Sequence, residues 1–91
     1  MTPAPNIIVE FFGLARVRSS QAQIMVAAAT AAEALKQVSQ TCPALSALLQ
    51  ADGRLAAEYL LCVNGTRFLI DLNDPLHDGD RLLLLSADAG G

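Results

Sequence analysis

The pattern of apolar and polar residues predicts short strands in the first third of the chain. Residues 7–14 are rich in branched and aromatic side chains, which are typical of a strand, and Gly13 marks its end. Residues 16–20 are polar, and residues 21–26 are again apolar enough for a strand. This part of the chain therefore predicts a hairpin of two strands.

One helix is predicted next, beginning at Thr30. Thr30 can cap the helix, and Glu33 follows it at the spacing of a capping box. Leu35, Val38 and Cys42 then fall at positions i, i+3 and i+7, so they share one face of the helix. This apolar face is expected to pack on the strands.

The second half of the chain predicts a short helical segment and three more strands. Residues 43–50 begin with a proline, which ends the first helix or starts a second, short one. Residues 59–63 form a strand, the Asn-Gly pair at 64–65 is typical of a two-residue hairpin turn, and residues 67–72 return as its partner. After further turns that contain Asp and Gly, residues 81–85 form the last strand.

The predicted order of elements is strand, strand, helix, strand, strand, strand. With the first and last strands as central neighbours, this order fits an α+β fold of the β-grasp (ubiquitin-like) type. Such a fold has a mixed sheet of four to five strands with one main helix packed across one face. Periodicity alone is compatible with several α+β arrangements.

Alternation along the strands predicts which side chains face the helix and which point away from it. If residues 7, 9 and 11 point to the helix, the outward set is apolar and includes Phe12, Leu60, Cys62, Leu83 and Leu85. A small protein seldom exposes such a patch without a partner, so we expect a docking surface. The alternative is that one register slips and part of the patch is core.

Composition narrows the class of protein. The 91 residues suffice for one domain, and a composition of 53% hydrophobic and 16% charged residues indicates a folded chain. The net charge is −3 and the basic residues are scattered, which argues against a nucleic-acid partner. We also expect no membrane partner, because no apolar segment is long enough to span a bilayer and the start lacks signal-peptide features.

Cysteine and histidine offer no candidate metal or catalytic site. Cys42 and Cys62 lie in no paired motif and His77 is the single histidine, so neither zinc nor a redox dithiol is expected. His77 lies in a polar turn, where we expect a solvated side chain rather than a catalytic acid or base. Two free thiols fit a reducing, cytoplasmic compartment.

The sequence ends in Gly90-Gly91, behind a short run of small residues. Two residues without side chains can let a carboxylate enter a narrow channel, because any Cβ there would add bulk. We therefore divide the chain into a globular domain, residues 1–85, and a flexible tail, residues 86–91. Gly91 is the expected reactive residue, with Gly90 beside it; the alternative is an incidental, frayed end.

Three segments together resemble a known family. Residues 9–16, Val-Glu-Phe-Phe-Gly-Leu-Ala-Arg, resemble the opening strand of the molybdopterin synthase small subunit. Val-Asn-Gly at 63–65, Asp-Pro-Leu-His-Asp-Gly-Asp at 74–80, an apolar strand and the terminal Gly-Gly match the second half of that family. These small ubiquitin-like proteins are sulfur carriers, and they are related to the carrier of thiamine synthesis.

The resemblance implies a non-catalytic carrier that works with several partners. A separate adenylating enzyme, similar to ubiquitin-activating enzymes, would use ATP to activate the Gly91 carboxylate, and a sulfur donor protein would provide the sulfur of a thiocarboxylate. The tail would then enter the large subunit of molybdopterin synthase, where the sulfur passes to a pterin precursor. The carrier itself would hold no permanent cofactor and no metal. We expect Arg16 and Ala89 to join the outward apolar set in contacting partners.

The tail departs from the family pattern. Family tails commonly carry a Pro-Pro-Val-type segment before the glycines, whereas residues 86–89 here are Ser-Ala-Asp-Ala. This departure bears on the pathway that the carrier serves. Three alternatives stay open: a carrier whose sulfur goes to thiamine, cysteine or a secondary metabolite; a ubiquitin-like modifier joined through Gly91 to a lysine; and a β-grasp interaction module with an incidental Gly-Gly.

Overall fold

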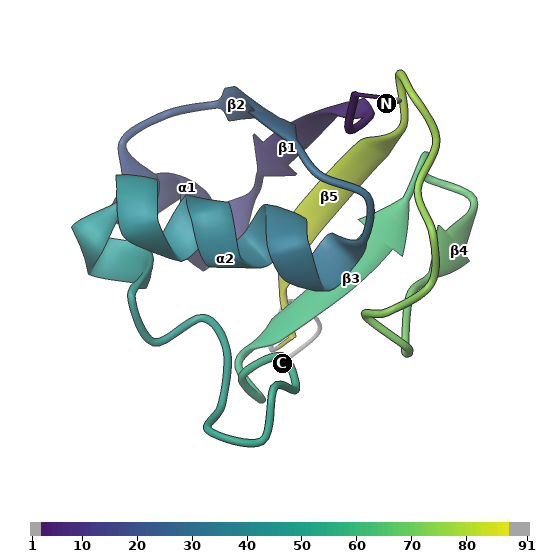
Figure 1. The fold of residues 1–91 in the computed structure, drawn as a ribbon. Helices are drawn as coiled ribbons and strands as arrows, with labels where there is room; N and C mark the ends of the chain where they lie inside the picture. Colours follow the sequence, from purple (N-terminus) through teal and green to yellow (C-terminus); the bar gives the residue numbers. More distant parts are fainter. Residues whose placement is uncertain (1–2, 88–91) are drawn as a thin grey trace.

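A computed structural model describes residues 3–87, whose strands form one five-stranded mixed sheet (Figure 1). In the order in which they lie across the sheet, the strands are β2 (Gln23–Ala27), β1 (Asn6–Phe11), β5 (Arg81–Ser86), β3 (Tyr59–Val63) and β4 (Arg67–Phe68). The helical segments are α1 (Gly13–Ser19), α2 (Ala31–Thr41) and the 3-10 turn η1 (Pro43–Leu45). Figure 1 shows α2 lying across one face of the sheet.

The two central strands, β1 and β5, come from opposite ends of the chain. They run parallel, while β2 flanks β1 and β3 flanks β5 in antiparallel pairs. The predicted mixed sheet with its first and last strands adjacent is therefore confirmed. The end of β5 lies beside the start of β3, at the opposite end of the sheet from the N-terminus (Figure 1).

The core lies between the sheet and α2. Alternate residues of the strands are almost fully buried there, as the sequence predicts: Ile7, Val9, Phe11, Tyr59, Leu61, Val63, Leu82 and Leu84. The predicted helix face, Leu35, Val38 and Cys42, packs against them. Burial of this apolar area is the main driving force for the fold.

The helix α2 begins where the capping box predicts. The Thr30 hydroxyl accepts the Glu33 N–H at 3.2 Å, and the Glu33 carboxylate accepts the Ala29 N–H at 3.0 Å. The Ala32 N–H is satisfied by the Leu72 carbonyl at 2.8 Å. Side chains and a distant loop therefore accept hydrogen bonds from N–H groups of the first turn, which have no acceptor within the helix.

The predicted hairpin of the first two strands is confirmed, but a helix that the sequence analysis did not predict, α1, lies between them. Ala15 is fully buried and anchors the helix on the core. The helix ends at Ser20, which has a φ of 58° and donates its N–H to the Arg16 carbonyl at 3.0 Å. Strand β1 consequently stops at Phe11 and does not reach residue 14.

Two further elements are shorter than predicted. The segment after α2 is helical over η1 alone and does not continue to residue 50. Strand β4 stops at Phe68 rather than 72, because Leu69 and Leu72 turn into the core and the chain moves toward the start of α2. Strand β5, in contrast, continues one residue past the predicted end, through Ser86.

Candidate docking face and root of the C-terminal tail

Four of the predicted docking residues form cross-strand pairs on β3 and β5. Leu60 lies opposite Leu85, and Cys62 lies opposite Leu83. Because directly opposed residues project to the same side of a sheet, these four side chains lie together. Their neighbours along each strand are buried under α2, so the four face away from it.

Phe12 extends this group across β5. It follows β1 in an extended conformation, and its N–H donates to the Leu84 carbonyl at 3.0 Å. Because Phe11 is buried in the core, alternation directs Phe12 to the outer face. With one residue added from β4, as described below, we call this surface the apolar strip: Phe12, Leu60, Cys62, Phe68, Leu83 and Leu85.

The members of the apolar strip differ in exposure. Phe12 and Leu60 are exposed, at 37% and 41%, and Leu83 and Leu85 are half-buried. The structure corrects the prediction that Cys62 is exposed: it faces outward but is only 8% exposed. Leu83 and Phe68 flank Cys62 on the adjacent strands. Cys62 therefore lies beneath its neighbours in the strip and is not available for contact with a partner.

Phe68 is a member of the strip that the sequence analysis missed. The Asn64-Gly65 turn has the two positive φ angles, 55° and 71°, of a tight hairpin. Thr66 is an extra residue, however, so that Val63 pairs with Arg67 and Cys62 with Phe68. The predicted two-residue connection was therefore wrong by one residue, and this slip places a 61% exposed phenylalanine on the outer face.

An ion pair also lies on the outer face. The Arg81 guanidinium, at the first residue of β5, donates at 2.7 Å to the carboxylate of Glu10, the second-last residue of β1. Leu83 and Leu85 follow Arg81 along β5 on the same side. The ion pair therefore adjoins the apolar strip, because Glu10 lies directly opposite Leu83.

The last described residues are held at the edge of the globule; we call Ser86 and Ala87 the tail root. Ser86 pairs with Tyr59, and the Ala87 N–H donates to the Glu58 carbonyl at 2.9 Å. On the other side, the Leu14 N–H donates to the Ser86 hydroxyl at 2.7 Å. The predicted site residues Ala89, Gly90 and Gly91 lie outside the described part of the chain.

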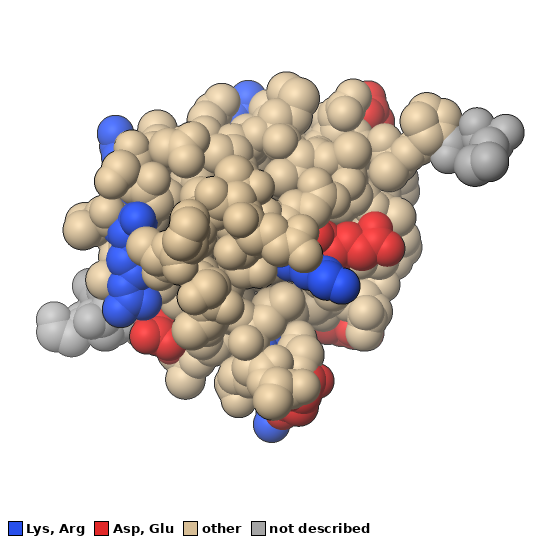
Figure 2. All heavy atoms as spheres, turned by 60° about the vertical axis from the view of Figure 1, so that its left-hand side comes forward, with Lys and Arg blue, Asp and Glu red and all other residues tan. Residues whose placement is uncertain are grey.

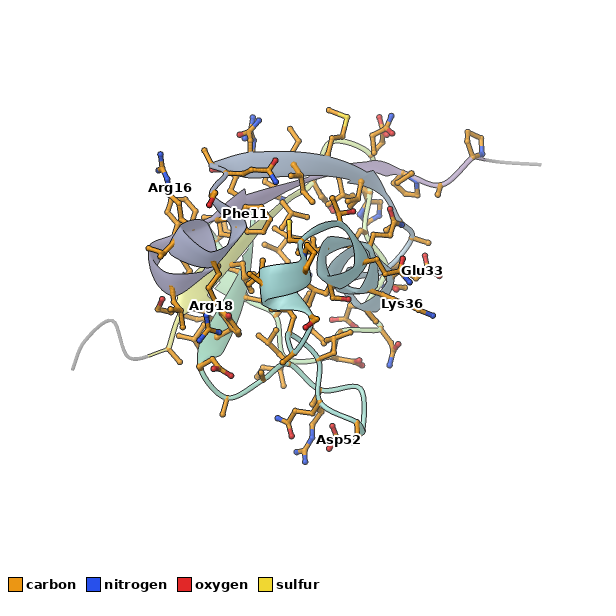
Figure 3. The ribbon with its side chains drawn as sticks, turned by 90° about the vertical axis from the view of Figure 1, so that its left-hand side faces the viewer. Phe11, Arg16, Arg18, Glu33, Lys36 and Asp52 are labelled. Atoms are coloured by element: carbon orange, nitrogen blue, oxygen red, sulfur yellow. The ribbon has the colours of Figure 1, made fainter. Side chains whose placement is uncertain are left out.

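The two arginines of α1 take different positions (Figure 3). Arg18 lies beside the end of β5, where its guanidinium donates to the Tyr59 hydroxyl at 2.7 Å and lies 3.6 Å from the Glu58 carboxylate. Arg16, the predicted partner contact, is exposed and points outward from α1. Arg18 therefore helps to hold the surroundings of the tail root, while Arg16 remains accessible.

The turn before β5 is a small polar network around Asp80. Its carboxylate accepts the His77 N–H at 2.8 Å and the Asn64 side-chain amide at 3.1 Å. These hydrogen bonds, the first above all, hold the pKa of Asp80 below its usual value. The His77 side chain is 85% exposed, which confirms the predicted solvated histidine.

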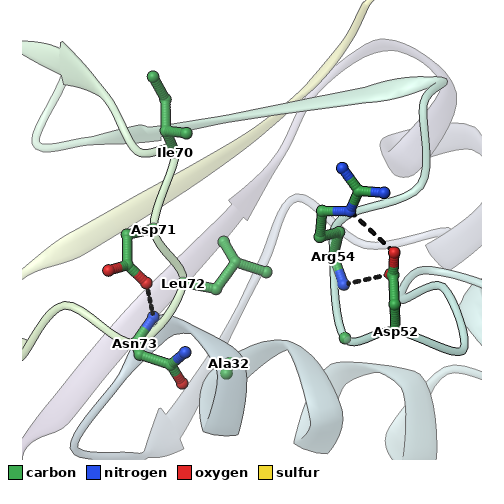
Figure 4. A pocket seen from close by; sticks show the side chains of 8 residues that line it. Ala32, Asp52, Arg54, Ile70, Asp71, Leu72 and Asn73 are labelled. Carbon is green, nitrogen blue, oxygen red and sulfur yellow. Dashed lines mark hydrogen bonds and ion pairs between the residues drawn. The ribbon is translucent and has the colours of Figure 1, made fainter.

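A shallow pocket of about 240 Å³ lies apart from the predicted site residues (Figure 4). It is bounded by the 52–54 loop and the 70–73 segment. In the loop, the Arg54 backbone N–H donates to the Asp52 carboxylate at 3.0 Å and the Arg54 guanidinium donates to it at 2.8 Å. These hydrogen bonds, the backbone one above all, hold the pKa of Asp52 below its usual value. In the pocket, Arg54 binds Asp52 and the Asn73 backbone N–H binds Asp71 (Figure 4).

Charge and metal-binding groups give no second candidate site. On the side shown in Figure 2, basic atoms lie in separate places rather than in a continuous stripe. Within residues 3–87, no cluster of His, Cys, Asp and Glu is arranged to hold a metal ion. None of the helices in this part of the chain combines the length and apolar character that a membrane span requires.

Comparison by sequence gives no relative: no family model and no curated protein matches the chain. Comparison by structure gives clear neighbours. Small archaeal modifier protein 1 from Methanosarcina acetivorans has a TM-score of 0.81, with 20% identity over 100% of both chains. The chain has the β-grasp fold of ubiquitin-like proteins.

Two other β-grasp neighbours come from protein complexes. The Amycolatopsis orientalis BexX/CysO complex matches with a TM-score of 0.76 and 24% identity, over 93% of this chain and 99% of that one. The complex of subunits 1 and 2 of molybdopterin-converting factor from Helicobacter pylori matches with a TM-score of 0.65 and 24% identity, over 94% and 99%. These neighbours are consistent with the resemblance found in the sequence.

Proposed function

We propose that this β-grasp protein is a sulfur carrier whose Gly91 carboxylate is adenylated and then converted to a thiocarboxylate. The observation that carries the proposal is the arrangement around β5. This central strand runs past the apolar strip and leads directly toward Gly90-Gly91. A docking face and a reactive terminus at the same end of one strand suit a protein that is acted on by others.

The chemistry requires reactants that the carrier does not hold. A Gly91 carboxylate oxygen attacks the α-phosphorus of ATP and releases pyrophosphate, which leaves an acyl adenylate. Sulfide sulfur then attacks the carbonyl carbon, and AMP leaves with the original oxygen. The adenylating enzyme would bind ATP, and a donor protein would deliver the sulfur. Adenylation makes the carboxyl carbon, otherwise a poor electrophile, reactive toward the sulfur nucleophile.

Partner binding is assigned to the apolar strip and Arg16. Phe12 and Leu60 provide exposed apolar area, and Arg16, four residues after Phe12, provides a charged contact. Clusters of aromatic, leucine and arginine side chains of this kind suit a protein interface that excludes water at its centre. Gly91 would enter the partner's channel first, followed by Gly90 and Ala89.

For the acceptor of sulfur, we propose molybdopterin synthesis in the cytoplasm, with this chain as the small subunit of the synthase. The sequence resemblance and a structural neighbour named as molybdopterin-converting factor support this choice. A carrier that serves thiamine, cysteine or secondary-metabolite synthesis is the alternative with the same chemistry, and the CysO neighbour is compatible with it. A protein modifier is the second candidate, favoured by the neighbour named as a modifier.

A transfer experiment distinguishes these candidates. The thiocarboxylated carrier is mixed with a molybdopterin synthase large subunit and the pterin precursor, and the terminus is followed by mass spectrometry. Return of the terminus to a carboxylate, with sulfur recovered in the pterin, is the expected result. A thiocarboxylate that persists there would contradict the molybdopterin assignment, and isopeptide-linked species in lysate would favour the modifier.

A further inference from the structure

Ser86 makes a contact that joins the two ends of the chain. Its hydroxyl accepts the Leu14 N–H at 2.7 Å, across a sequence separation of 72 residues. The first N–H groups of a helix have no partner within the helix. Phe12, which precedes α1, offers no side-chain acceptor. Ser86 at the end of β5 therefore provides the acceptor that the start of α1 lacks.

Gly13 leaves the space that this contact needs. It has a φ of 55°, a conformation that side chains disfavour. A Cβ at Gly13 would overlap the Ser86 hydroxyl and approach the Ser86 Cβ to 3.2 Å. The residue that begins α1 and the residue that ends β5 are thus matched in shape.

The tail root is also held from the side of β3. The Ala87 N–H donates to the Glu58 carbonyl at 2.9 Å, and Tyr59 pairs with Ser86. Arg18 of α1 binds the Tyr59 hydroxyl and lies 3.6 Å from the Glu58 carboxylate. Contacts from α1 and from β3 therefore meet at the tail root.

We propose that Ser86 is a positioning residue, which through its bond to the Leu14 N–H fixes the tail root, from which the sequence continues to Gly91. This inference rests on the proposed function. Residues 88–91 span at most about 14 Å when extended, so the direction at their root decides which points Gly91 can reach.

The inference predicts a particular kinetic change. A partner bound through the apolar strip must still draw the terminus into its active site, which is an intramolecular step. A loosened root lowers the effective concentration of the Gly91 carboxylate there. Ser86→Ala should therefore reduce kcat for adenylation about three- to tenfold, while KM for the carrier stays within about twofold.

The test compares adenylation and thiocarboxylation kinetics of full-length variants with their amide hydrogen exchange. Ser86→Ala should speed exchange at Leu14 and lower kcat. Gly13→Ala should also speed exchange at Leu14 and lower kcat. Ser86→Thr keeps the hydroxyl and should retain the wild-type exchange rate and kcat. The matched control is Ser39→Ala, which removes a hydroxyl bonded to the Lys36 carbonyl of α2. It should leave both values unchanged.

The outcomes separate the possible failures. Unchanged exchange at Leu14 in Ser86→Ala would overturn the inference. Faster exchange with wild-type kcat would overturn it too, because the contact would then be merely structural. A wild-type protein that forms no adenylate would overturn the proposed function and the inference with it, and this result is seen without any variant.

Discussion

At the scale of single residues, Asp80 holds the turn that leads into β5. The His77 N–H and the Asn64 amide bind its carboxylate and lower its pKa. A carboxyl group with a lower pKa in the folded state stabilises the fold above its unfolded pKa, and this stabilisation is lost as pH falls through the folded pKa. We therefore expect the free energy of unfolding to decline as pH drops below about 4, and Asp80→Asn to reduce that decline.

Urea unfolding of both proteins at a series of pH values measures this contribution. At pH 7 Asp80→Asn should itself cost about 1–2 kcal/mol, because it weakens two charge-assisted hydrogen bonds. Asp52→Asn is a comparison with the same direction of effect: the pKa of Asp52 is also lowered, so this variant should reduce the decline too, although its pair with Arg54 lies on an exposed loop. An Asp80→Asn variant with the pH slope of the wild type would show that Asp80 does not carry the effect.

The residue-scale features that could be predicted from sequence are local ones. Thr30 and Glu33 are three residues apart, so the capping box is visible in the sequence and is found in the structure. The bond between Leu14 and Ser86 has no such signal, because only the adjacency of α1 and β5 brings the two residues together. The exposure of Cys62 was mispredicted for the same reason: its cover comes from neighbouring strands.

At the scale of elements, the cap of α2 gives a direct test of the helix boundary. Thr30→Ala removes the acceptor of the Glu33 N–H and should lower the free energy of unfolding by about 1 kcal/mol. The control is Thr41→Ala, at the exposed last residue of α2. Chemical denaturation measures both, and equal stability losses would contradict the assignment of Thr30 as the cap.

The apolar strip predicts a separation of binding from stability. Leu60→Asp or Phe12→Asp should weaken binding to the adenylating enzyme by about 2 kcal/mol or more if these residues are central anchors. Their effect on the free energy of unfolding should be well below that, because both side chains are exposed. Calorimetric titration and thermal unfolding are measured on the same samples.

Gln40→Asp is the control for charge, since it adds the same negative charge at an exposed position of α2, on the other side of the sheet from the strip. It should leave binding unchanged. If Leu60→Asp or Phe12→Asp unfolds the protein, the outer face is part of the core. If they bind as tightly as Gln40→Asp does, the strip is not the docking surface.

The elements that were mispredicted have short or subtle signals. α1 has a single buried residue, Ala15, so its seven residues show no helical period against the polar stretch that follows. The hairpin turn was recognised from Asn64-Gly65, but the extra residue Thr66 changes the pairing without changing the turn signal. Elements with a clear apolar period, such as β3 and α2, match their predicted bounds closely.

At the scale of the whole molecule, the topology explains why both ends of the chain matter for function. Parallel pairing of β1 with β5 brings Phe12 and α1, from the start of the chain, beside the last strand. Sequence pattern alone left several α+β arrangements open, and the resemblance to ubiquitin-like carriers selected the one found. The acceptor in the proposed sulfur transfer has no comparable signal, since it would depend on which partner docks on the strip.

The measurement that tests the central claim most directly is the intact mass of the protein after incubation with ATP, the adenylating enzyme and sulfide. The account predicts an AMP adduct, followed by the mass change of one oxygen replaced by one sulfur, with fragmentation placing the change on Gly91. A variant that lacks Gly91 is the control and should show neither product. An unmodified wild-type mass, or an equal yield from the variant without Gly91, would contradict the account.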